Sequence, residues 1–287
     1  MPRQRSVAAC LTAALAMGAL AWASQASAQS SAQGSAPAAA APATVTLCTA
    51  IDLCYCVNAA YRDRIDANIA RVRRLIAENR QQGKAVGYLS IPISPAGGGY
   101  APFNIMAAGD IAGDVEIRFG KRAVFVLNPA AEGSKEMEGA GGADYMYMWT
   151  TILEGPKGQG EDFDFFYFAG PSDFANAFRL PGTGALEVLD DYFDARLQDD
   201  PAFKAAVDSG AVTKRGFRNY YGLRAAVSFS LGSHDEWNIA RILNDRRRGV
   251  AEYGIPNQIA VFFDGRPVTP GGYESPTASG DVGRCIR

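Results

Sequence analysis

The segment with the densest set of reactive side chains covers residues 233–238 and reads Ser-His-Asp-Glu-Trp-Asn. It holds the only histidine of the chain, His234, next to the carboxylates of Asp235 and Glu236. A carboxylate such as Glu236 can attack the anomeric carbon of a sugar and form a covalent intermediate, and His234 or a second carboxylate can handle the proton. The same segment has a purely structural interpretation. Ser233 followed by Glu236 three positions later matches a capping box, and Asp235 would then interact with the helix dipole.

Polar residues also lie at the ends of four short apolar runs that are typical of buried strands. These runs cover residues 85–91, 123–127, 163–168 and 259–263, and the polar residues at or after their ends are Ser90, Ser94, Asn128, Asp173 and Asp264. Ligands of open parallel sheets bind at the carboxyl ends of the strands. We therefore expect Ser90, Ser94, Asn128 and Asp173 to bind a polar small molecule, although the same residue types also form turns and cap helices.

The order of hydrophobic patterns predicts an α/β fold. Helical spacing of apolar residues predicts helices over residues 58–82, 103–119, 144–153, 185–198, 201–209, 214–231 and 235–248. Strands that alternate with helices are typical of a parallel sheet with crossover helices. We therefore expect a Rossmann-like open parallel sheet of about four to five strands. The consecutive helices near the middle of the chain predict a helical insertion over residues 182–231.

The N-terminal 28 residues have the pattern of a secretory signal peptide. Arg3 and Arg5 precede an apolar stretch, and Ala26-Ser27-Ala28 matches a small-residue cleavage site. Residues 29–44 are rich in Ala, Ser, Pro and Gln, which predicts a flexible linker and leaves residues 45–286 as a single α/β domain. No later apolar run has transmembrane length. We therefore expect a secreted or periplasmic protein without membrane insertion.

Four cysteines follow the predicted leader, and they are Cys48, Cys54, Cys56 and Cys285. An even number of cysteines in an exported protein indicates disulfides. A Cys54–Cys56 bond is sterically poor because a strand points these side chains to opposite faces. Both remaining connectivities join the N-terminal segment to Cys285. A zinc site is the alternative, but the spacing fits no common zinc pattern.

Composition excludes several classes of function. Lysine and arginine total 28 against 30 aspartate and glutamate, and removal of Arg3 and Arg5 with the leader changes the net charge from −2 to 26 − 30 = −4. This balance offers no basic face for a nucleic acid. A single histidine argues against a histidine-rich metal site. The glycines at 97–99 match neither common phosphate-loop motif, so we expect neither a metal nor another cofactor.

Five features occur in a distinctive order along the chain: a loop at Tyr88–Ser94, a strand ending at Asn128-Pro129, a helix start at Ala143–Met146, a strand at Phe163–Tyr167, and Glu236 on a helix before Gly254–Ile259. This order resembles the nucleoside 2-deoxyribosyltransferase-like proteins and related nucleotide N-glycosidases. The resemblance implies that Glu236 is the nucleophile that takes the glycosyl group from a base, with Asp144 orienting the substrate. That family has small residues around its glutamate, whereas Trp237 follows Glu236 here and would reshape the substrate pocket.

Three functional hypotheses follow from these observations. The first is an exported glycosidase or glycosyltransferase, that is, a hydrolase or a transferase. It would cleave an N-glycosidic bond with Glu236 as the nucleophile, assisted by Asp144, Asp173 or His234. The second is a non-catalytic binding module for a small molecule or a protein on the same fold. The third is a structural domain with a degenerate site. Relatives of this fold often share active sites across subunits, so the sequence leaves a monomer and a homodimer open.

Overall fold

The computed structural model describes residues 43–94, 98–132, 137–223, 230–250, 257–269 and 283–285, which belong to one unit spanning residues 42–287. The predicted signal peptide and nearly all of the predicted linker lie outside these residues, as do positions 251–256. No helix in the described ranges is long and apolar enough to cross a membrane.

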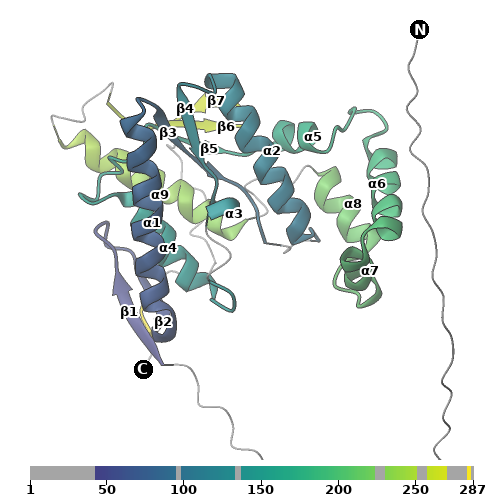
Figure 1. The fold of residues 1–287 in the computed structure, drawn as a ribbon, viewed down its shortest axis with the longest axis horizontal. Helices are drawn as coiled ribbons and strands as arrows, with labels where there is room; N and C mark the ends of the chain where they lie inside the picture. The colour runs from purple at the N-terminus through teal and green to yellow at the C-terminus, as the bar shows by residue number, and fades with distance from the viewer. Residues whose placement is uncertain are drawn as a thin grey trace, which may run out of the picture. The chain divides into compact units, whose positions relative to one another are not determined.

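The fold is α/β, as the sequence predicts, and its centre is a five-stranded sheet in the order β4-β3-β5-β6-β7 (Figure 1). The strands are β3 (Ala85–Ser90), β4 (Val124–Leu127), β5 (Phe165–Phe168), β6 (Ala260–Phe263) and β7 (Arg266–Val268). The first four are parallel, and β7 pairs antiparallel with β6 at the edge. The chain passes from β3 to β4 on one side and returns to β5 on the other. This reversal makes the boundary between β3 and β5 the topological switch point, where ligands of such sheets bind.

Helices cover both faces of the sheet because the strands are apolar on both sides. One face packs against α1 (Arg62–Gln81), α4 (Gly142–Glu154) and α9 (Leu231–Arg248), and the other packs against α2 (Ala101–Phe119) and α5 (Pro171–Ala177). Side chains alternate between these faces along each strand. Val86 and Tyr88 of β3 therefore point to the α9 side, whereas Leu89 points to the α2 side.

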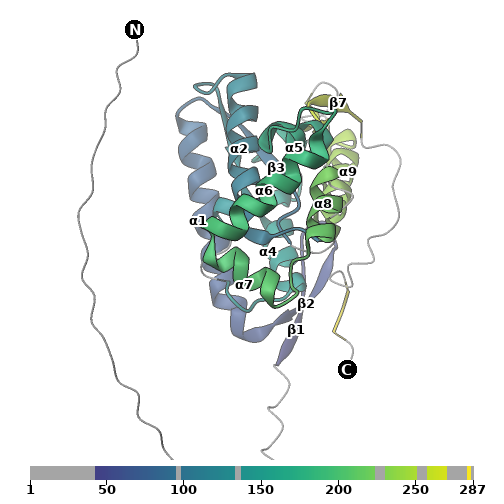
Figure 2. The same cartoon turned by 90° about the vertical axis from the view of Figure 1, so that its right-hand side faces the viewer.

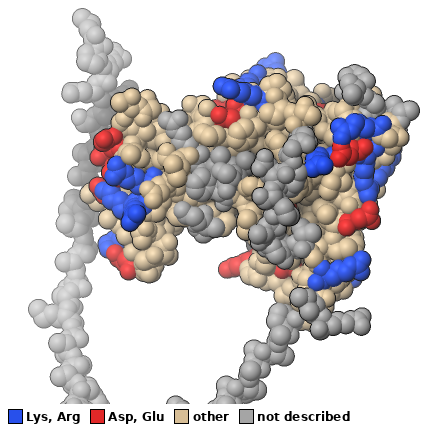
Figure 3. Space-filling model, turned by 180° about the vertical axis from the view of Figure 1, so that it is seen from behind, with Lys and Arg blue, Asp and Glu red and all other residues tan. Residues whose placement is uncertain are grey.

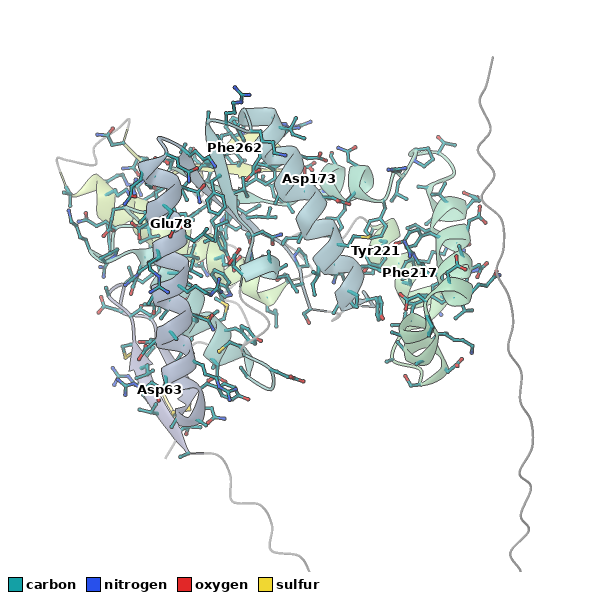
Figure 4. All side chains as sticks on the ribbon, in the orientation of Figure 1. Asp63, Glu78, Asp173, Phe217, Tyr221 and Phe262 are labelled. Carbon is teal, nitrogen blue, oxygen red and sulfur yellow. A yellow bond between two sulfur atoms is a disulfide. The ribbon has the colours of Figure 1, made fainter. Side chains whose placement is uncertain are left out.

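The helical insertion consists of α6 (Ala185–Asp199), α7 (Pro201–Asp208) and α8 (Lys214–Gly222), which face the viewer in Figure 2. Aromatic side chains fill the space between these helices and the first turn of α2. Phe217 of α8 lies 6.0 Å from Phe103 of α2 and 5.3 Å from Phe193 of α6, measured between ring centroids (Figure 4). The buried amide of Asn104 donates to the carbonyls of Ile93 and Ser94, and so connects the loop after β3 to α2.

An N-terminal β-hairpin was not predicted from the sequence. It pairs β1 (Thr44–Cys48) with β2 (Cys54–Asn58) in antiparallel register. Disulfides join Cys48 to Cys54 and Cys56 to Cys285. The predicted joining of the N-terminal segment to Cys285 is therefore confirmed, and the connectivity that the sequence left open is resolved.

Most predicted elements are present, with shifted ends. The helix expected from residue 58 begins at Arg62 after a short 3₁₀ turn over Ala59–Tyr61. The helix expected over 214–231 ends at Gly222, and residues 224–229 lie outside the described ranges. The short helices α3 (Pro129–Glu132) and α5, and the edge strand β7, were not predicted.

Candidate functional site

Glu236 lies buried at the switch point of the sheet. The Tyr88 hydroxyl donates a hydrogen bond of 2.6 Å to Glu236 Oε1, and the Glu236 residue is 8% exposed. Tyr88 and Ser90 point to the same side of β3 because they are two residues apart. Helix α9 precedes the parallel strand β6 as a crossover helix, so its N-terminal turns lie at the carboxyl edge of the sheet, where β3 ends. The alternation of side chains along β3 and the direction of α9 together bring the Glu236 carboxylate next to the Tyr88 hydroxyl.

The start of α9 shows that the capping-box interpretation is wrong. The helix begins at Leu231, and its N-cap is Ser230, whose hydroxyl accepts a hydrogen bond from the Ser233 amide at 3.1 Å. Glu236 consequently stands in the second turn and faces the sheet, too far along the helix to cap it. The sequence predicted that this helix starts at Asp235, with Ser233 as its cap. The true cap, Ser230, lies three residues earlier, so the helix starts earlier than predicted.

The surroundings of Glu236 keep its carboxyl group near its midpoint of ionisation at neutral pH. Burial raises the pKa of Glu236 from 4.5 to about 7, the hydroxyls of Ser90 and Tyr88 oppose that rise, and the nearby charge of Asp235 adds to it. Burial and the proximity of Glu236 also raise the pKa of Tyr88 well above 10.0. A carboxyl group with both forms populated can act as a base, an acid or, when ionised, a nucleophile.

Three buried polar groups lie on the strand and the helix that carry Tyr88 and Glu236. Within the described part of the chain, the Ser90 hydroxyl, the Ser233 hydroxyl and the Trp237 indole N–H are buried and make no hydrogen bond. Ser90 lies close enough to lower the pKa of Glu236, although its hydroxyl does not reach hydrogen-bonding geometry. The Trp237 ring packs edge-on against Phe168, the last residue of β5, with ring centroids 4.8 Å apart.

The structure does not bring Asp144 and His234 to the Glu236 carboxylate. Both Asp144 oxygens are engaged, since Oδ2 accepts from the Gly141 amide and Oδ1 from the Asn58 amide, each at 2.8 Å. Asp144 therefore caps α4 and fastens it to β2. His234 is partly exposed and stands two residues before Glu236 on α9, a spacing at which helix side chains do not face each other.

The remaining predicted site residues have structural partners at other strand ends. Asn128 accepts a hydrogen bond from the Ala130 amide and so starts α3. Asp173 accepts from the Gly170 amide and from the Tyr167 hydroxyl, which places it on the α2 side of the sheet. Asp173 is labelled on α5 in Figure 4. Ser94 is exposed, and its carbonyl binds Asn104.

Tyr88 is the residue that sequence reasoning missed. It lies within an apolar run and was therefore assigned to the core, where its ring does pack. The signal that could have found it is the alternation of strand side chains, which places Tyr88 on the same face as the candidate residue Ser90.

A hollow lies on the insertion, between α6 and α8. Its lining consists of Leu186, Asp190, Lys214, Arg215, Arg218 and Asn219. Figure 3 shows lysine and arginine side chains gathered over this part of the molecule, with acidic side chains next to them. Lys214 pairs with Asp194, and Arg218 lies 3.6 Å from Asp190, so much of the positive charge is already compensated.

Comparison with known proteins found no matching family model, no matching curated protein and no matching solved structure. The described residues contain no group of three or more His, Cys, Asp or Glu side chains arranged to hold a metal ion. Any functional assignment therefore rests on the geometry around Glu236.

Proposed function

We propose that this protein is an exported enzyme that cleaves an N-glycosidic bond, with Glu236 as the nucleophile. The observation that carries the proposal is the buried Glu236 carboxylate, held by the Tyr88 hydroxyl at the switch point between β3 and β5. A buried carboxylate with a raised pKa destabilises the folded state when it is ionised, and such groups cluster at functional sites. The disulfides support export, because such bonds persist in oxidising compartments.

The reaction has two displacement steps at the anomeric carbon. In the first, an ionised Glu236 oxygen attacks this carbon and the carbon–nitrogen bond breaks. The leaving base keeps the electron pair of that bond and receives a proton from water. In the second, water or an acceptor attacks the same carbon, the glycosyl ester breaks, and the Glu236 carboxylate is restored as the attacking group loses a proton. Tyr88 is a positioning residue, since its hydroxyl fixes one oxygen of the carboxylate.

The test compares the wild type with Glu236→Gln, and uses Glu78→Gln, an exposed position on α1, as the matched control. Each protein is incubated with nucleosides, nucleotides, NAD and aryl glycosides, and released base or aglycone is measured by chromatography. We expect release by the wild type and by Glu78→Gln, with a loss of at least about a thousandfold in Glu236→Gln, as is usual when a unit of the catalytic machinery is removed. Mass spectrometry of quenched protein should find a glycosyl adduct on the peptide that contains Glu236. Equal release by wild type and Glu236→Gln would contradict the proposal, and binding without release would favour a binding module.

A further inference from the structure

The outer face of α8 carries positive charge at the end of the helix that disfavours it. Lys214 and Arg215 occupy the first turn, Arg218 follows in the second, and the first turn holds no acidic residue. The amino end of a helix has a partial positive charge, which stabilises carboxylates there and repels cations. Any polar side chain would suit an exposed helix face. The choice of three cations therefore breaks a local rule, and such exceptions are typical of functional sites.

Acidic side chains of α6 neutralise only part of this charge. Lys214 Nζ lies 2.7 Å from each carboxylate oxygen of Asp194. Arg218 stands 3.6 Å from Asp190, which is beyond normal hydrogen-bonding distance. Arg215 is exposed and forms no ion pair or hydrogen bond with any residue that the structure describes. Arg215, and in part Arg218, are therefore available to a ligand.

These cations line the hollow between α6 and α8, whose volume of about 470 Å³ is within the usual range of small-molecule sites. Arg215, Arg218 and Asn219 occupy positions i, i+3 and i+4 of α8, so they share one helix face. Leu186 and Asp190, four residues apart on α6, line the hollow with them. Leu186 is 41% exposed. The hollow therefore combines N–H donors from one helix face with an apolar surface.

This hollow and Glu236 belong to opposite faces of the sheet. Phe217 of α8, labelled in Figure 4, packs in the aromatic cluster on the α2 side. Tyr88, which binds Glu236, points to the α9 side. The insertion also contains none of the five sequence features that carry the family resemblance. A site in the hollow is therefore separate from the proposed catalytic carboxylate and does not depend on the proposed function.

We propose that the hollow on the insertion binds a phosphate monoester group through Arg215, Arg218 and Asn219. Two guanidinium groups and an amide offer more N–H donors than one carboxylate can accept, whereas a phosphate monoester has three terminal oxygens and nearly two negative charges at neutral pH. The ligand replaces Asp190 as the partner of Arg218, and its organic part rests on Leu186. Soluble phosphate esters and the lipid phosphatidic acid share this chemistry.

The first test measures binding to the whole protein by calorimetry at constant ionic strength, with inorganic phosphate, phenyl phosphate and benzoate as probes. Phenyl phosphate should bind more tightly than benzoate, which has the same ring but a carboxylate. Arg215→Gln and Arg218→Gln should each weaken phenyl phosphate binding about tenfold or more. Arg122→Gln, at an exposed position just before β4, is the matched control and should leave binding unchanged. Asp190→Asn should tighten binding more than Asp191→Asn, which removes the same charge from an exposed neighbouring position.

The second test identifies the source of the phosphate group by sedimentation of the protein with phosphatidylcholine vesicles, with and without phosphatidic acid. Binding of phenyl phosphate alone would assign a soluble ester, and binding of phosphatidic acid vesicles alone would assign a lipid headgroup. No binding in either experiment would overturn the inference, as would equal binding of benzoate or unchanged binding in both arginine variants. Loss of phosphate binding in Glu236→Gln would also overturn it, because the ligand would then occupy the other site.

Thermal unfolding without ligand shows whether Arg215 has a structural role instead. Arg215→Gln should leave Tm unchanged or raise it, because it removes a cation from the amino end of α8. Phenyl phosphate should raise the Tm of the wild type more than that of Arg215→Gln, since a ligand stabilises the state that binds it. A clear Tm loss in ligand-free Arg215→Gln would overturn the inference, because Arg215 would then have a partner within the protein.

Discussion

Replacing Tyr88 with Phe should raise the pKa of Glu236, because it removes a hydrogen bond that favours the ionised carboxylate. The bond measures 2.6 Å and opposes the rise that burial causes. Hydrogen bonds to charged groups contribute about 1.5–3 kcal/mol, and one pH unit corresponds to about 1.4 kcal/mol, so the titration midpoint should move upward by roughly one to two pH units. The ring contacts of Tyr88 with Trp149, Phe163 and Phe166 remain available to phenylalanine, so the fold should be retained.

The assay is a ¹³C NMR titration of the glutamate carboxyl signals, in which the signal missing from Glu236→Gln identifies Glu236. Tyr167→Phe is the matched control. Tyr167 is an equally buried strand tyrosine, but its hydroxyl donates to Asp173 and its ring belongs to the α2 side of the sheet. Its substitution should leave the Glu236 midpoint near pH 7. A midpoint that stays unchanged or falls in Tyr88→Phe would refute the role assigned to this hydrogen bond.

Two further predictions concern stability. The pKa of Glu236 is about 7 in the folded protein and 4.5 ordinarily, so the folded state binds the proton more tightly and wild-type stability falls as pH rises through this window. In urea unfolding, the free energy of unfolding of Glu236→Gln relative to the wild type should therefore increase between pH 5 and pH 8, by up to roughly 3 kcal/mol. A capping role predicts instead that Glu236→Gln is less stable than the wild type at both pH values. The disulfides close loops of very different length, 229 residues for Cys56–Cys285 and 6 for Cys48–Cys54. Chain-entropy arguments predict that paired serine substitutions cost about 5 and about 2 kcal/mol respectively, and equal losses in urea unfolding would contradict this account.

The parallel sheet was predictable because its strands are short, apolar and separated by helical patterns. The hairpin was not predictable, because β1 and β2 have only five residues each and the cysteines were the only clear signal in that segment. Strand order also lies beyond local patterns. Nothing in the sequence near β5 shows that it pairs with β3 rather than β4, a choice that depends on which face each crossover helix covers.

The candidate site was predictable only in part, because local sequence patterns do not show which tertiary partners a side chain has. Glu236 was found because a carboxylate among polar residues is conspicuous, and Ser90 because it ends a strand. Asp144 looked equally suitable, but two backbone amides occupy its carboxylate, and those partners come from a loop and from β2. Helix caps and reactive carboxylates use the same residue types, so only the tertiary partners distinguish them.

The hairpin and the candidate site are connected through α4. Three hydrogen bonds fasten the length of this helix to the hairpin, joining Asn58 to Asp144, Tyr55 to Thr150 and Ile51 to Glu154. The other side of α4 meets the start of α9, where a Cβ atom added to Gly232 would lie 3.6 Å from Met146 Sδ. The Cys48–Cys54 bond joins β1 to β2, β2 holds α4, and α4 packs against the turn that carries Ser233 and precedes Glu236. The hairpin is thus connected through α4 to the helix that bears the carboxylate.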